Sequence, residues 1–127
     1  MEINFGSDGG KTCHVTITGQ VDKASSTPEP ILFFSKLEPP PKRMRIDGIQ
    51  FAIQEKMGFN LWWIMCRDEQ QIPNFKLIMP LESRGGFDFE KIKPIQSPDG
   101  ATGIALTSFK VTEKNMTFML MLDLTKQ

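Results

Sequence analysis

Short segments in which apolar and polar residues alternate recur along this chain, with turn residues between them. In Cys13–Thr18 and Met116–Leu124 every second residue is apolar, which is the period of a β-strand with one buried face. Clusters rich in Gly, Pro, Asn and Asp, such as Ser97–Gly100, separate the segments at intervals of about 8 to 12 residues. This spacing predicts an all-β fold, an antiparallel β-sandwich of about eight or nine strands that is jelly-roll-like or immunoglobulin-like.

The expected strands share apolar or β-branched residues and are bounded by turn residues; they are Glu2–Phe5, Cys13–Thr18, Ile31–Phe34, Met44–Ile53, Phe59–Cys66, Phe75–Met79, Gly86–Phe89, Gly103–Val111 and Met116–Leu124. The apolar residues change phase between Ile46 and Ile49, which predicts a β-bulge at Asp47–Gly48. The run Ile49–Lys56 also meets helical spacing, but its β-branched and aromatic residues favour a strand. A turn at Glu55–Gly58 is then expected to close a hairpin onto the next strand.

The length of 127 residues suits a single domain, residues 1–127, with a substantial core. The 15 basic and 15 acidic residues balance, so no net field attracts the protein to nucleic acid or to a membrane surface. The segment Met1–Phe5 lacks the basic and apolar regions of a signal peptide, and no run approaches the roughly 20 apolar residues of a membrane span. We therefore expect a protein of the cytoplasm or of a virion, with Cys13 and Cys66 as reduced thiols.

The segment GSDGGKT, Gly6–Thr12, is similar to the phosphate loop G-x-x-x-x-G-K-[ST]. When Gly10-Lys11-Thr12 is aligned with the end of that motif, its first glycine should stand at position 5, which is Phe5. Gly6 comes one residue too late to take that place. A phosphate loop also opens a helix, whereas the residues after Thr12 alternate as in a strand. The segment is therefore expected to be the turn of a hairpin, and no nucleotide-binding residue is predicted.

Residues with catalytic or metal-binding chemistry are few. His14 is the only histidine and falls in the outward phase of its strand, so spacing gives no support to a nucleophile relay around it. Adjacent strand residues point to opposite faces, so Cys13 and His14 cannot easily share a metal ion with Cys66. The acidic pairs Asp68–Glu69 and Asp88–Glu90 are typical of solvated strand ends. We therefore expect no catalytic residue, no metal and no cofactor, and a protein that is not an enzyme.

Two adjacent tryptophans, Trp62 and Trp63, stand in the most apolar segment of the chain. In a strand they must point to opposite faces, so one fills the core while the other lies on an outer sheet face. The outer indole is expected to lie under a loop such as Arg67–Gln71, to pack against another subunit or to stack on a sugar ring.

Two further pairs of residues are candidates for the same interface. Met119 and Met121 occupy the side of their strand on which a water-facing strand normally carries polar residues. Glu82 and Arg84 fall on the same side of an extended chain and are expected to pair locally or across an interface.

The order of three segments, IDGIQFAIQEKMGFNLWW, LIMPLESRGG and the terminal MLMLDLTKQ, resembles small single-domain β-sandwich proteins that decorate or cement the capsids of tailed phages. The resemblance covers about Arg45–Gln127, carries no site motif and implies a structural role. The leading hypothesis is a non-enzymatic protein that acts by assembling with itself or with another structural protein, such as a major capsid protein. The alternative is a lectin-like module that stacks a glycan on the exposed tryptophan.

Overall fold

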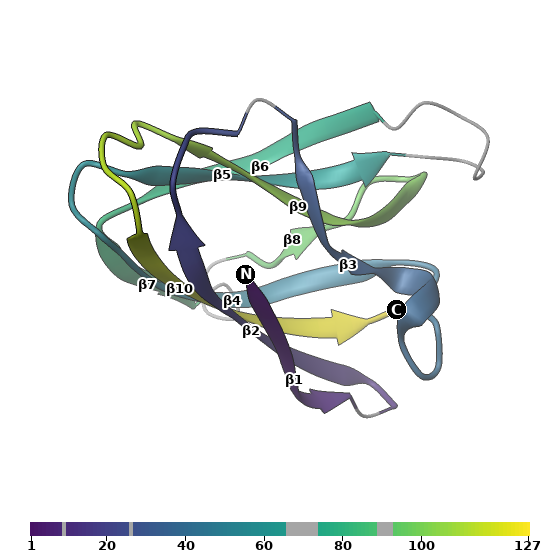
Figure 1. Ribbon diagram of the computed structural model, residues 1–127. Helices are drawn as coiled ribbons and strands as arrows, with labels where there is room; N and C mark the ends of the chain where they lie inside the picture. The colour runs from purple at the N-terminus through teal and green to yellow at the C-terminus, as the bar shows by residue number, and fades with distance from the viewer. Residues whose placement is uncertain (9, 26, 66–73, 89–92) are drawn as a thin grey trace.

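The computed structural model describes residues 1–8, 10–25, 27–65, 74–88 and 93–127, which form two antiparallel sheets packed face to face (Figure 1). Sheet A contains, in spatial order, β1 (Glu2–Asp8), β2 (Thr12–Val21), β10 (Met116–Lys126), β4 (Met44–Ile53) and β7 (Arg84–Asp88), with β8 (Ile95–Gln96) also paired to β4. Sheet B contains β3 (Glu29–Phe33), β9 (Ala101–Phe109), β5 (Gly58–Met65) and β6 (Asn74–Glu82), and a 3-10 helix, η1 (Phe34–Lys36), follows β3. The predicted all-β antiparallel sandwich is confirmed.

The chain crosses between the sheets at most of its connections. From β2 to β5 the chain alternates between sheets A and B, and β5 and β6 then pair within sheet B. After β6 the chain enters sheet A at β7, sheet B at β9 and sheet A again at β10. The resulting order, β2-β10-β4-β7 facing β3-β9-β5-β6, is that of a double-sheet jelly roll. Strands β1 and β8 are additions to sheet A. Of the two predicted sandwich types, the strand order is therefore the jelly-roll one.

Two local predictions from the sequence are confirmed. Strands β1 and β2 pair antiparallel, as the hairpin reading of GSDGGKT requires, and Thr12 begins a strand rather than a helix. Strand β1 continues to Asp8 instead of ending at Phe5, so Gly6–Asp8 belong to the strand and not to the turn. On β4, Gly48 pairs with Asp123 while Ile46 pairs with the next residue of β10, so Asp47 is the extra residue of a β-bulge. The bulge restores the inward direction of the apolar residues on both sides of it.

The hairpin expected at Glu55–Gly58 is wrong. This turn takes the chain from β4 in sheet A across to β5 in sheet B, where β5 pairs with β6 and β9 instead. Turn residues specify that the chain reverses, but they do not specify which sheet the next strand joins.

The described residues form ten strands rather than eight or nine. The unexpected one is β8, whose two residues are too few to show a period. The helical alternative for Ile49–Lys56 is wrong, because β4 continues as a strand to Ile53. Within the described ranges no helix has the length and apolarity of a transmembrane span.

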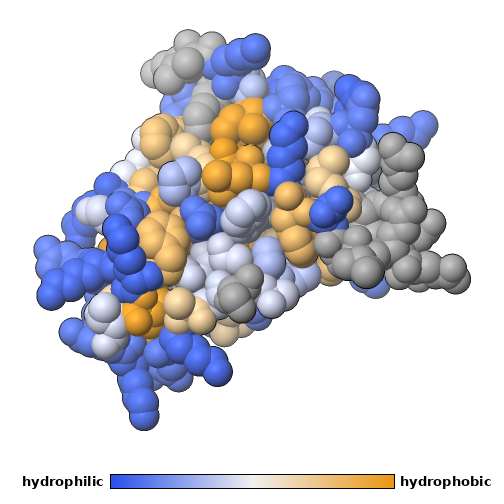
Figure 2. All heavy atoms as spheres, turned by 90° about the horizontal axis from the view of Figure 1, so that it is seen from above, coloured by the Kyte–Doolittle hydropathy of each residue, from blue (hydrophilic) through white to orange (hydrophobic). Residues whose placement is uncertain are grey.

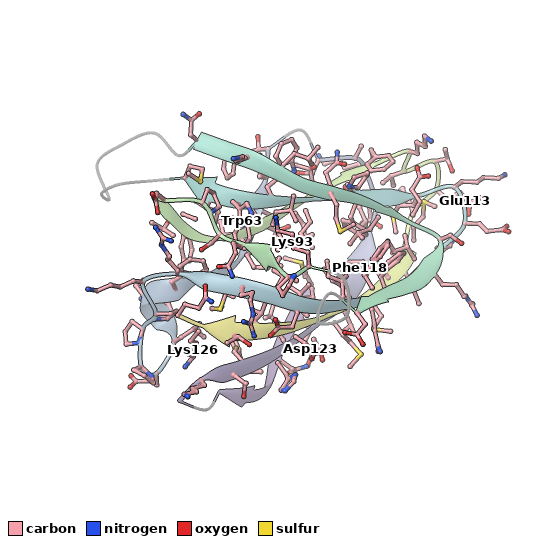
Figure 3. All side chains as sticks on the ribbon, turned by 180° about the vertical axis from the view of Figure 1, so that it is seen from behind. Trp63, Lys93, Glu113, Phe118, Asp123 and Lys126 are labelled. Atoms are coloured by element: carbon pink, nitrogen blue, oxygen red, sulfur yellow. The ribbon has the colours of Figure 1, made fainter. Side chains whose placement is uncertain are left out.

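The core lies between the sheets and is built from the inward positions of both. Every second residue of β10 from Met116 to Leu124 is buried, as the alternation predicts. Phe118 of sheet A packs against Phe59 of sheet B with ring centroids 4.5 Å apart, and Trp63 meets Phe34 edge to face at 6.5 Å. Figure 3 shows Trp63 and Phe118 between the two layers. These aromatic contacts across the sandwich fix the inward face of each sheet and therefore also its outer face.

Candidate functional site

The two adjacent tryptophans point to opposite sides of sheet B, as the strand geometry requires. Trp63 is 3% exposed and belongs to the core, whereas Trp62 is half-buried on the outer face. The predicted cover of the outer indole, Arg67–Gln71, lies outside the described residues. Trp62 is therefore the residue on which the search for a site on sheet B centres.

Apolar residues from all four strands of sheet B surround Trp62. Trp62 pairs with Leu77 on β6 and with Ala105 on β9, and the neighbouring Ile64 pairs with Phe75 and Gly103. Directly paired residues lie on the same side of a sheet, so these side chains form one surface. On the far edge strand, β3, Phe33 pairs with Gly103 and extends the same row. We call this surface the apolar face of sheet B; it consists of Phe33, Trp62, Ile64, Phe75, Leu77 and Ala105.

The apolar face is open to solvent at several points. Leu77 is 48% exposed and Phe33 is 41% exposed, although Ile64 between them is buried by its neighbours. Figure 2, which views the molecule from the side of sheet B, shows groups of hydrophobic residues near the middle of this face, with hydrophilic residues between them and around the margin. The adjoining row, in which Asn60 pairs with Pro80 and Thr107, is uncharged as well. A contiguous, uncharged, aromatic-rich surface is typical of the centre of a protein interface.

The polar end of the Trp62 side chain is already satisfied within the sheet. Its indole Nε1–H donates a hydrogen bond of 2.9 Å to the hydroxyl oxygen of Thr107, which is itself 9% exposed. A partner that covers the indole therefore does not leave an unpaired donor, which would otherwise cost about 1–3 kcal/mol. The hydrogen bond also holds the ring in a fixed orientation before any partner arrives.

Sequence reasoning predicted that either Trp62 or Trp63 lies on the outer face but missed the other residues of the apolar face. Phe33 and Leu77 belong to short segments in which apolar residues follow one another, so their period does not say which of them point outward. A bulge on β6 between the partners of Leu61 and Trp62 also shifts the phase of that strand. The sequence did contain one signal for these residues. Ile31–Phe34 and Leu77–Met79 are runs of consecutive apolar residues, whereas a strand with one buried face needs an apolar residue only at every second position.

The other predicted interface residues are divided between the two sheets. Met119 and Met121 lie on the outer face of sheet A, where Met119 pairs with Ala52 and Met121, 39% exposed, pairs with Gln50. Arg84 also pairs with Ala52, so it lies on the same face as Met119, with Ala52 between the two. The structure thus brings Met119, Met121 and Arg84 together but puts them on the side of the sandwich opposite Trp62.

Glu82 and Arg84 do not share a side of the chain. Ser83 between them has a left-handed backbone with φ of 66°, and the chain passes there from β6 in sheet B to β7 in sheet A. The Glu82 carboxylate instead accepts a hydrogen bond of 3.2 Å from the Lys110 ammonium at the margin of sheet B. The expected local pair is therefore replaced by a longer-range one.

We expect the pair between Glu82 and Lys110 to stabilise the fold by less than about 1 kcal/mol, because both side chains are more than half exposed. A double-mutant cycle with Glu82→Gln and Lys110→Met, read from urea unfolding, measures it. The matching cycle with Glu82→Gln and Arg84→Gln should give no coupling. A larger coupling in the second cycle would contradict the pairing described above.

A shallow polar hollow of about 330 Å³ lies on sheet A over the bulge at Gly48. His14 on β2 and Asp123 on β10 are paired across the strands and form an ion pair there when the imidazole is protonated. Deeper in, the Asp47 carboxylate accepts hydrogen bonds from Arg45 Nε, at 2.6 Å, and from the Thr125 hydroxyl. Among the described residues no three or more His, Cys, Asp and Glu side chains are arranged to hold a metal ion.

The remaining candidate residues occupy separate places. Cys13 is buried on the inward face of β2 and His14 points outward, so the two do not converge. Cys66, Asp68–Glu69 and Glu90 lie outside the described residues, and the reduced state of the cysteines stays a prediction. Lys11 precedes β2, and its carbonyl oxygen accepts a 2.6 Å hydrogen bond from the Lys126 backbone N–H. That contact ties the turn to the C-terminal strand.

No protein-family model matches the sequence, and a comparison with curated proteins gives no significant match.

Proposed function

We propose that this chain is a non-enzymatic structural protein that works by protein–protein assembly, as a surface or capsid-decoration component of a phage virion. The observation that supports assembly is the apolar face of sheet B. Removing exposed apolar surface from water stabilises a complex by about 25 cal/mol per Å², so the exposed Phe33 and Leu77 beside Trp62 favour association. Trp62, whose only polar group is bonded to Thr107, is suited to burial under another protein.

The virion part of the proposal is supported by the strand order. The double-sheet jelly roll is frequent among viral capsid domains, although it also occurs in lectins and in cupins. The strand order therefore agrees with the structural role that the sequence resemblance implies, and because one fold serves many functions, the role itself is tested by the experiment below.

The surroundings of Trp62 do not favour the carbohydrate-binding alternative. A glycan stacked on an indole needs polar groups nearby to bind its hydroxyls, as ligand sites generally do. The residues paired with Trp62, Leu77 and Ala105, are apolar, and the Thr107 hydroxyl already accepts the indole N–H. We expect no quenching of tryptophan fluorescence by sugars and no binding on a glycan array. Saturable quenching by one sugar class would favour the lectin-like function instead.

Co-sedimentation tests the assembly function directly. The purified chain is mixed with the structural proteins encoded by neighbouring genes, and its own mass is measured by light scattering at micromolar concentrations. We expect association in at least one of these experiments, and capsid, portal or tail genes beside this one would support the virion role. A chain that stays strictly monomeric and binds none of those proteins would overturn the proposal.

A further inference from the structure

We draw no further inference here: the strongest candidate, the shallow polar hollow on the outer face of sheet A, is a cluster of acidic side chains around His14 whose buried carboxylate, Asp47, is already bonded to Arg45 and Thr125, and nothing in the structure shows what it would bind.

Discussion

Replacing Trp63 with alanine is expected to lower the free energy of unfolding by about 3–5 kcal/mol. The indole is 3% exposed, fills the space between the sheets and meets the Phe34 ring edge to face at 6.5 Å. Removing it leaves a cavity that the paired strands on either side cannot close, so the loss of burial and the loss of packing add. Urea unfolding followed by circular dichroism, with linear extrapolation to water, measures the change.

Trp62→Ala is the matched control for this prediction. It removes the same side chain one position away, but from the outer face, where the indole is only partly buried and donates a hydrogen bond to Thr107. We expect a cost of about 1–2 kcal/mol, measured at a concentration low enough that association does not contribute. Equal costs for the two substitutions would show that both indoles lie in the core and would contradict the outer position of Trp62.

Gly103→Ala is expected to destabilise the fold by about 3 kcal/mol, at the upper end of the range for overpacking. A Cβ atom at this position would lie 2.3 Å from the backbone carbonyl oxygen of Leu32 on β3 and 3.1 Å from Cδ1 of Ile64. A side chain can rotate away from such a contact, but the Leu32 carbonyl belongs to the paired backbone of β3 and β9. The two strands must therefore separate, which also disturbs the apolar face.

The same substitution at Gly10 separates this steric effect from the general effect of alanine. No atom lies within 4 Å of a Cβ built at Gly10, so Gly10→Ala should change the free energy of unfolding by less than about 0.5 kcal/mol. Thermal unfolding of both variants provides the comparison. If Gly103→Ala were as mild as Gly10→Ala, the close pairing of β3 with β9 would be wrong.

Much of the secondary structure could be predicted, because the period of two is visible within each segment. The inward residues of β10, the outward direction of His14 and the bulge at Asp47 all follow from local alternation and a single change of phase. The two-residue strand β8 and the crossing at Glu55–Gly58 could not be predicted. The first is too short for a period, and the second depends on which strands pair at long range.

The candidate site shows the same division. Alternation alone requires that Trp62 and Trp63 point to opposite faces of their strand. Met119 and Met121, on the outer side of β10, already indicate an unusually apolar outer surface. Neither feature reveals which tryptophan is inside. That choice depends on the packing of Trp63 against Phe34 from η1, a residue far from it in the sequence.

The amino-acid pattern thus specifies a two-sheet antiparallel fold and the residues of each strand that share a side, because both are properties of neighbouring residues. The grouping of outer residues into surfaces depends on strand order, which long-range hydrogen bonding establishes. The jelly-roll order gathers Phe33, Trp62 and Leu77 from three strands on one face of the molecule, and it puts Met119 and Met121 on the other.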